Sequence, residues 1–301
     1  MVEKISQILK GKTAIITGAN SGIGLETVKD FVQKGAHVVM AVRSLEKGRQ
    51  ARDKIQQNYS QAEIDVMKLD LADLESVRAF AKNFVATYDS LNLLINNAGV
   101  MIPPHSKTRD GFELQFGSNH LGHFALTGLL LPLLKKTPES RVVTVSSLAH
   151  KGSRIFFDNL NGDKGYKAMQ FYGQSKLANL LFAQELDKKL KQHGLPTKSF
   201  ACHPGISSTN LFKFGKKDAP KFFKGLMDRF LQPAEMGALP TIYAATEPSL
   251  TGGEYIGPDG KGRRRGYPEL DTPHPAANDE ETSKKLWELS EKLTGVTFDF
   301  N

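Results

Sequence analysis

Short runs of apolar, β-branched residues alternate along this chain with longer stretches of helical period. We interpret six runs as strands: 13–18, 37–42, 64–70, 91–96, 141–147 and 198–203. Crossover helices are predicted at 22–34, 45–58, 73–88 and 111–136, and a fifth helix, carrying "FYGQSKLANLL", precedes the sixth strand. Strands that alternate with helices indicate a parallel sheet covered on both faces. The pattern therefore predicts a single doubly wound α/β domain.

The pattern loosens after residue 204, where the chain elaborates on the sheet. A helix is predicted at 233–246, a short seventh strand in "GGEYIGP" and a closing amphipathic helix at 278–293. The segment 205–232 mixes Phe, Lys and Gly, and its part 211–231 holds five phenylalanines among basic residues. Three interpretations stay open there: a substrate lid, a core helix, or a helix on a membrane surface.

Composition narrows the class of protein. An apolar fraction of 40% and a charged fraction of 24% in 301 residues are typical of a soluble globular domain. No apolar run approaches the ~20 residues of a membrane-spanning helix, and "MVEKISQILKGK" predicts a short surface helix, not a signal peptide. Cys202 is the only cysteine, which excludes an intramolecular disulfide and favours a cytoplasmic setting. The net charge of +8 suits a polyanionic cofactor as well as nucleic acid or an anionic membrane.

The first strand leads directly into the glycine-rich stretch "TGANSGIG" and then into a helix. Gly18, Gly22 and Gly24 give the spacing G-x-x-x-G-x-G. A strand-to-helix turn of this kind lets a pyrophosphate approach the backbone and sit at the positive helix N-terminus. A tight loop that needs positive φ is the alternative. The position at the start of an α/β chain favours a dinucleotide cofactor.

The end of the second strand indicates which dinucleotide binds. NAD sites commonly place a carboxylate there for the ribose 2′-hydroxyl, whereas an arginine accommodates a 2′-phosphate. This chain has Val42 and Arg43 at that point, with Lys47 one turn later. We therefore expect NADP(H) to be preferred over NAD(H).

Tyr172 and Lys176 lie four residues apart, on one face of a predicted helix. A free tyrosine has a pKa of about 10, so it exchanges protons poorly near neutrality unless its anion is favoured. The ammonium of Lys176 is placed to favour it. The pair is either a catalytic device or two polar residues on a solvated helix.

Further motifs decide between these alternatives because they occur in a recognisable order. After "TGANSGIG" come "LDL" at 69–71, "NNAG" at 96–99, "NHLGHF" at 119–124, "VSS" at 145–147, Tyr172-x-x-x-Lys176 and "HPG" at 203–205. With these motifs the chain resembles the short-chain dehydrogenase/reductase family over roughly residues 10–260. It resembles most the retinol dehydrogenase-like branch, which is also similar to protochlorophyllide reductase, and the resemblance implies a Rossmann-type sheet of about seven strands.

The resemblance implies roles for residues at the matching positions. Ser147 donates a hydrogen bond to the substrate oxygen, Tyr172 exchanges the proton, Lys176 favours the phenolate and binds a ribose hydroxyl, and Asn119 anchors a water that leads to solvent. The expected cofactor-binding residues are Gly18, Asn20, Ser21, Gly22, Ile23, Gly24, Arg43, Lys47, Asp70, Leu71, Asn97, Ala98, Gly99, Tyr172, Lys176, Pro204, Gly205, Ile206 and Thr209.

Two serines are adjacent in "VSS", and strand alternation lets only one of them face the site. The family pattern selects Ser147 over Ser146. The separation of Ser147 from Tyr172, twenty-five residues, exceeds the dozen or so of simpler members. Such an insertion is a trait of the retinol dehydrogenase-like branch.

Three further features are interpreted as structural. His120 and His123 have the spacing of metal ligands, but no third ligand is evident, so no metal site is predicted. The stretch "KGRRRG" at 261–266 is interpreted as a solvated loop, not a nucleic-acid patch. Trp287 is expected to pack in the core.

The sequence thus predicts an NADP(H)-dependent oxidoreductase that interconverts an alcohol and a carbonyl, on a bulky apolar substrate of retinoid, steroid or lipid type. A cofactor-binding scaffold without catalysis is the alternative, and a basic nucleic-acid or membrane-surface protein is a third hypothesis that rests on charge alone. The expected partner is a small-molecule substrate, without nucleic acid. Weak membrane-surface contact and a homo-oligomer are both left open.

Overall fold

The computed structural model describes residues 7–206 and 232–301 of the chain. Its centre is an eight-stranded sheet in the order β3-β2-β1-β4-β5-β6-β7-β8, in which only β8 is antiparallel to its neighbour. The strands are β1 (Thr13–Thr17), β2 (His37–Val42), β3 (Ile64–Lys68), β4 (Leu93–Asn96), β5 (Arg141–Val145), β6 (Lys198–Cys202), β7 (Tyr255–Pro258) and β8 (Pro268–Leu270).

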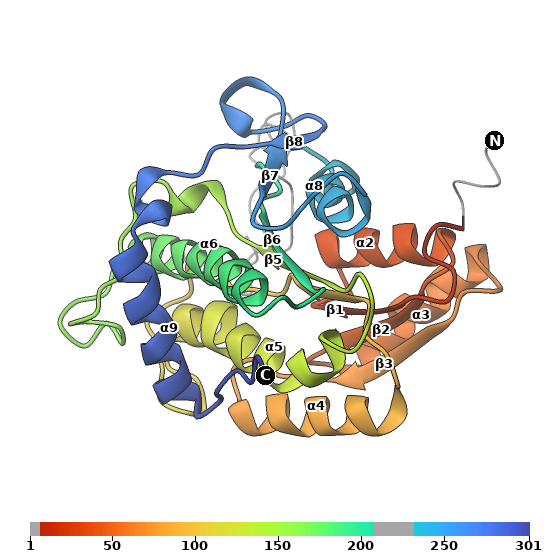
Figure 1. Cartoon of the computed structure of the whole chain (residues 1–301), viewed down its shortest axis with the longest axis horizontal. Coiled ribbons are helices and arrows are strands. Elements are labelled where there is room, and N and C mark those ends of the chain that lie inside the picture. The colour runs from red at the N-terminus through yellow and green to blue at the C-terminus, as the bar shows by residue number, and fades with distance from the viewer. Residues whose placement is uncertain (1–6, 207–231) are drawn as a thin grey trace.

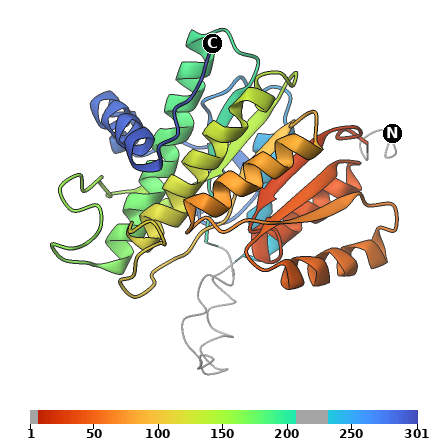
Figure 2. The same ribbon diagram turned by 90° about the horizontal axis from the view of Figure 1, so that it is seen from below.

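Helices cover both faces of this sheet, as Figures 1 and 2 show. The longer helices are α2 (Gly22–Gln33), α3 (Leu45–Asn58), α4 (Leu74–Thr87), α5 (Gly122–Leu134), α6 (Ala168–Gln192), α8 (Ala234–Thr246) and α9 (Glu280–Thr294). Short helical segments are η1 (Phe116–Leu121, a π-helix), η2 (Leu148–His150), η4 (Lys261–Arg263) and η5 (Pro275–Asn278). On one face α2 packs against α8, and on the other α4 packs against α5 while α9 lies outside α5 and α6.

The two layers of helices bury two separate apolar clusters, and β1 shows why. Its residues alternate between the faces: Ala14 and Ile16 pack with α2 and α8, whereas Ile15 packs with α4, α5 and α6. A strand that is apolar on both faces is typical of a parallel sheet covered on both sides. Trp287 of α9 is buried in the second cluster, as the sequence predicted.

The predicted fold class is confirmed: one doubly wound α/β domain with seven parallel strands. Two details differ from the expectation. The sequence missed β8, whose three residues have a single partner strand and carry no apolar run. Residues 7–11 form a turn, not the surface helix expected there, and the proposed lid at 205–232 lies almost entirely outside the described residues.

Membrane-spanning helices and metal sites are both absent from the described residues. Among these residues no helix combines the length and apolar character that crossing a membrane requires. Nor does any group of three or more His, Cys, Asp and Glu side chains in the same ranges have the arrangement of a metal site.

Candidate active site

A cavity of about 440 Å³ opens at the carboxyl ends of β1, β2, β4 and β5. The strand order reverses at this point, because the chain runs outward through β2 and β3 and then returns to place β4 on the other side of β1. Ligands of doubly wound folds bind at such a switch point. The cavity is lined by Thr17, Gly18, Asn20, Ser21, Gly22, Ile23, Gly24, Ala41, Arg43, Ser44, Lys47, Leu69, Asp70, Leu71, Ala72, Asn97, Ala98, Gly99, Val100, Leu114, Ser118, Val145, Ser146, Tyr172, Lys176 and Pro204.

The glycine turn between β1 and α2 has the shape that a pyrophosphate requires. Gly18 and Gly22 have φ of 66° and 54°, which glycine adopts without strain. A Cβ at Gly24 would lie 2.6 Å from both the Asn97 Nδ2 and the Gly18 carbonyl oxygen, so only glycine fits. The N-cap residue, Ser21, makes no side-chain cap, and no acidic residue lies in the first turn of α2. Its N-terminal dipole therefore faces the cavity and can hold an anion.

Basic residues follow β2 at the other end of the cavity. Arg43 and Lys47 are exposed and line it together with Ser44, the N-cap of α3, whose side chain accepts from the Lys47 backbone N–H. Lys68 on β3 donates to the Arg43 carbonyl oxygen at 2.6 Å and so fixes the backbone that carries the guanidinium. Asp70, which follows β3, also lines the cavity, and its Oδ1 accepts from the Ala72 N–H at 3.0 Å.

The loop after β4 is held by Thr17, which sequence reasoning did not single out. The Thr17 hydroxyl accepts from the backbone N–H groups of Asn97 and Ala98, both at 2.9 Å. It also lies 2.9 Å from Nε2 of His123. His123 Nδ1 lies 2.8 Å from the Asn119 carbonyl oxygen and must donate to it, so Nε2 accepts from Thr17. These contacts hold "NNAG" against the end of β1, beside the glycine turn, and connect Thr17 with His123, 106 residues further along the chain.

Asn119 lies in the π-helix η1, a local distortion that often marks a functional site. Its fully buried amide accepts from the Val100 N–H at 2.8 Å and donates to the Val100 carbonyl and the Ser175 hydroxyl, each at 2.9 Å. Asn119 therefore secures the residue after "NNAG" to α6. The water expected beside it stays a prediction.

Tyr172 and Lys176 lie on the buried face of α6 and line the cavity. Lys176 is 4% exposed, its Nζ donates to the Val145 carbonyl oxygen at 3.0 Å, and burial lowers its pKa to about 8. No salt bridge to it occurs in residues 7–206 or 232–301, so its buried charge can attract hydroxyl groups of a ligand. The solvated-helix alternative is thereby excluded.

Burial sets the pKa of Tyr172 in the protein alone. The sequence predicted that Lys176, helped by the positive nicotinamide, favours the phenolate, and that effect stays a prediction. In the protein alone, burial of the phenol raises the pKa to about 12, against the smaller lowering by a hydrogen bond from Ser147. The Lys176 ammonium lies 5.8 Å from the centroid of the Tyr172 ring and donates its hydrogen bond to the Val145 carbonyl oxygen instead. Tyr172 thus holds its proton at neutral pH and can donate it.

The two serines of "VSS" point in different directions, as strand alternation predicted. The buried Ser146 hydroxyl donates to the Lys176 carbonyl oxygen at 2.7 Å and so braces α6. Ser147 turns the other way, toward Tyr172, and its Oγ accepts from the Ala149 N–H at 3.2 Å. A hydroxyl that accepts from the backbone keeps its own proton to donate.

The turn "HPG" closes the cavity beside β6. Pro204 lines the cavity, and Gly205 has a φ of 67°. A Cβ at Gly205 would lie 2.3 Å from the Arg264 carbonyl oxygen, so this turn touches the C-terminal loop closely. Ile206 is 36% exposed, and Thr209 lies outside the described residues.

The structure thus gathers most of the predicted residues around one cavity. Asn119, Ser147, Gly205 and Ile206 are not among the residues that line it, although Ser147 and Gly205 directly follow the lining residues Ser146 and Pro204 in the chain. His120 and His123 have separate partners, since His120 Nε2 pairs with Ser290 at 2.8 Å. The basic stretch 261–266 is only partly solvated, because Arg263 pairs with Glu269 and Asp271.

This sheet and this cavity define the class of dinucleotide-binding α/β oxidoreductases. The chain belongs to the short-chain dehydrogenase family, whose sequence profile matches residues 12–219. Its similar relatives include mouse retinol dehydrogenase 11, 43% identical over 97% of this chain and 89% of the relative. Mouse retinol dehydrogenase 14 is 40% identical over 96% and 87%. The expected membership of the retinol dehydrogenase-like branch is confirmed.

Solved structures show the same fold. The crystal structure of an uncharacterised protein from Mycobacterium paratuberculosis is 40% identical, with a TM-score of 0.82 over 99% of this chain and 98% of that one. A short chain dehydrogenase from Shigella flexneri, complexed with NADP, is 23% identical, with a TM-score of 0.64 over 83% and 98%. A nicotinamide cofactor and an alcohol or carbonyl substrate follow for this family.

Proposed function

We propose that this chain is an NADP(H)-dependent oxidoreductase that interconverts an alcohol and a carbonyl on a bulky apolar substrate. The observation that carries the proposal is the continuity of the cavity. It runs from Arg43 and Lys47, past the bare glycine turn, to Tyr172 and Lys176. The bare turn, which a Cβ would fill, and the basic far end fit a dinucleotide that carries an extra phosphate.

The residues at the other end would act on the substrate. A bound nicotinamide cofactor supplies or accepts the hydride. Ser147 donates a hydrogen bond to the carbonyl oxygen and polarises the C=O bond without giving up its proton, while Tyr172, protonated at neutral pH, transfers the one proton to that oxygen as general acid. Lys176 binds a ribose hydroxyl and orients the sugar.

The proposed substrate class rests on the apolar residues beside this site. Val100 and Leu114 line the cavity, and Met169, 58% exposed, lies one helical turn before Tyr172 on α6. The relatives are named retinol dehydrogenases, which is consistent with a long apolar substrate. The predicted lid at 211–231 remains a proposal, because it lies outside the described residues.

A screen of carbonyl compounds tests the function. NADPH oxidation is followed at neutral pH with retinal, long-chain aldehydes, steroids and quinones, with short aldehydes of equal reactivity as matched controls. We expect turnover, with lower KM for the long apolar carbonyls. Binding of NADPH without turnover of any carbonyl would favour the scaffold alternative instead.

A further inference from the structure

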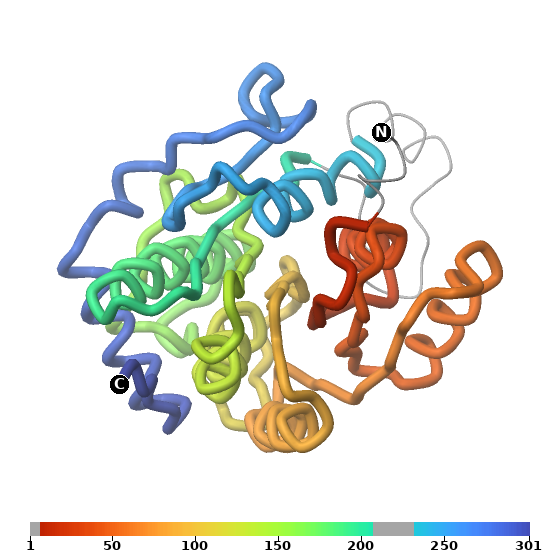
Figure 3. The backbone as a smooth tube through the Cα atoms, turned by 45° about the vertical axis from the view of Figure 1, so that its right-hand side comes forward, coloured from red at the N-terminus to blue at the C-terminus, as the bar shows by residue number. Residues whose placement is uncertain are grey.

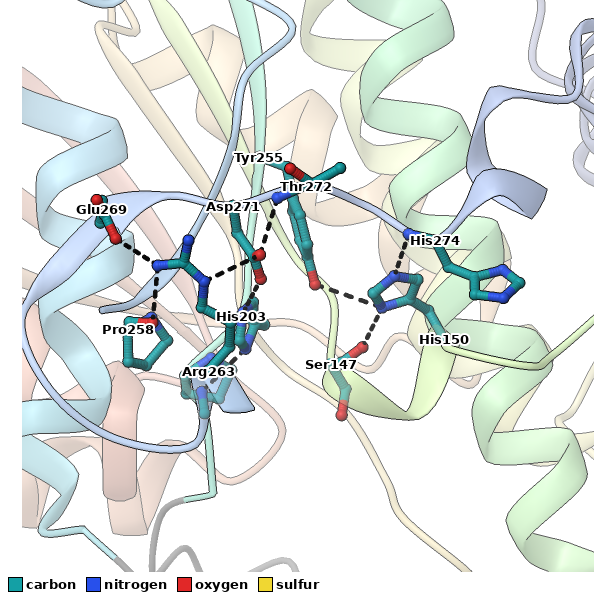
Figure 4. A network of polar contacts seen from close by, with 12 residues as sticks. Ser147, His150, His203, Tyr255, Pro258, Arg263, Glu269, Asp271, Thr272 and His274 are labelled. Atoms are coloured by element: carbon teal, nitrogen blue, oxygen red, sulfur yellow. Dashed lines mark hydrogen bonds and ion pairs between the residues drawn. The ribbon is translucent and has the colours of Figure 1, made fainter. Parts of the chain in front are cut away.

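The C-terminal loop reaches the back of the candidate site through one buried carboxylate. Asp271 follows β8 and its side chain is 5% exposed. Its Oδ2 lies 2.9 Å from Nε2 of His203, the residue that precedes Pro204, and Figure 4 shows the two side chains directed toward each other. The pair joins segments 68 residues apart in sequence.

The protonation of His203 follows from its other partner. Its Nδ1 accepts from the Gly205 N–H at 3.1 Å, so the ring proton is on Nε2 and is donated to Asp271. The ring is completely buried and lies flat against Gly257, where a Cβ would approach Nε2 to 2.0 Å. His203 thus has one position, and that position fixes the Gly205 amide.

Asp271 is held in turn by the loop 259–270. Arg263 Nε lies 3.3 Å from its Oδ1, and the Thr272 N–H donates to the same oxygen at 2.8 Å. Arg263 also pairs with Glu269, which is 57% exposed. The basic loop therefore serves to orient one buried carboxylate, a task that the sequence "KGRRRG" did not reveal.

We propose that Asp271 is a positioning residue, which acts through His203 to hold the turn 203–206 at the nicotinamide end of the cavity. That the nicotinamide half of a cofactor binds beside this turn rests on the proposed function. Asp271 lies beyond residues 12–219, the part matched by the family profile. The C-terminal segment is thus part of the active-site framework.

Binding of two ligands to the intact chain tests the proposal. The turn 203–206 would touch only the nicotinamide half of NADPH, whereas 2′,5′-ADP lacks that half. We expect Asp271→Ala to weaken NADPH about tenfold, as the loss of a charge-assisted hydrogen bond supports, and to leave 2′,5′-ADP unchanged. Asp271→Asn should restore most of the NADPH affinity, because its amide oxygen can still accept from His203.

The matched control is Glu269→Ala, which removes the exposed partner of Arg263 and should leave both affinities as in the wild type. Should Asp271→Ala fail to fold, the same two affinities are measured for Arg263→Gln, for which we expect a smaller loss of NADPH affinity and no change for 2′,5′-ADP. The proposal would be overturned if the affinities for both ligands fell equally, since a general structural defect does not distinguish the two halves of the cofactor. It would also be overturned if neither affinity fell.

Amide hydrogen exchange separates this inference from the proposed function. Without nucleotide, the Gly205 N–H is bonded to His203 and the Ile206 N–H to the Arg264 carbonyl at 2.7 Å. Both should exchange faster in Asp271→Ala and at the wild-type rate in Glu269→Ala. If the wild type bound no nucleotide, the proposed function would fall while exchange still decided whether Asp271 holds the turn. Unchanged exchange would refute that.

Discussion

Arg43 is the residue that we expect to determine the preference for NADP(H) over NAD(H). Its exposed guanidinium lines the phosphate end of the cavity, and a fork of donors suits a 2′-phosphate. We expect NADPH to bind at least about tenfold more tightly than NADH, a gap of ~1.4 kcal/mol. Arg43→Asp should reverse this order, whereas Arg49→Asp, the same charge change outside the cavity, should not. Fluorescence titration of the wild type and both variants with each cofactor measures the six affinities, and equal values in the wild type would contradict the assignment.

The sequence could predict the orientation of a side chain where residues nearby in the chain determine it. The four-residue spacing of Tyr172 and Lys176 placed both on one buried helix face, as observed, because local geometry sets it. The choice of Ser147 over Ser146 as the serine that faces the site stays a prediction, since Ser146 is the one that lines the cavity. Thr17, which pairs with His123, could not be predicted in the same way. Nor could Asp271 on His203, since a contact between segments far apart exists only once the sheet has formed.

Among the elements, the junction of β1 and α2 is the most constrained. The missing Cβ of Gly24 leaves room for the Asn97 amide and the Gly18 carbonyl. Gly24→Ala should therefore push the turn out of position and weaken NADPH by more than about tenfold. Lys29→Ala, on the exposed side of the same helix, is the control and should keep wild-type affinity. Retained NADPH affinity in Gly24→Ala would show that the turn does not form the phosphate site.

The elements predicted correctly are those whose pattern is long or apolar. The six strands up to Cys202 and the helices α2, α3 and α4 lie where periodicity placed them, with ends shifted by at most two residues. The helix predicted to carry "FYGQSKLANLL" is observed as α6, which extends beyond that stretch at both ends. The predicted helix 111–136 instead begins at residue 114 and soon passes through the π-helix η1, in which the Asn119 side chain ties the Val100 backbone to Ser175. Such a side-chain contact leaves no trace in hydrophobic periodicity.

In the whole molecule, buried histidines should make the free energy of unfolding fall as the pH becomes acidic. Burial lowers the pKa of His120 to about 3 and of His123 to about 4. Since the unfolded chain binds these protons near pH 6.5, the stability is present above that pH and is lost as pH falls toward the folded pKa values. Between pH 7 and pH 5 the two histidines together should lower the free energy of unfolding by about 4 kcal/mol.

Urea unfolding at pH 7, 6 and 5 measures this loss. In His120→Gln, about half of the loss of unfolding free energy that these two histidines cause should remain. The variant removes one of the two groups that bind a proton in the unfolded chain but not in the native state. His193→Gln, on the exposed end of α6, is the matched control and should lose stability with acid as the wild type does. A wild-type slope in His120→Gln would mean that His120 does not carry the effect.

The Tyr172→Phe variant, measured with NADPH and the best carbonyl substrate of the wild type, tests whether Tyr172 is the proton donor. The ring and its packing remain, and only the transferable proton is removed. Turnover should fall by about 10²–10⁴-fold, the contribution of a positioned general acid, while the dissociation constant of NADPH stays within about twofold of the wild type. Retention of more than about a tenth of the wild-type rate would contradict the assignment of Tyr172 as the proton donor.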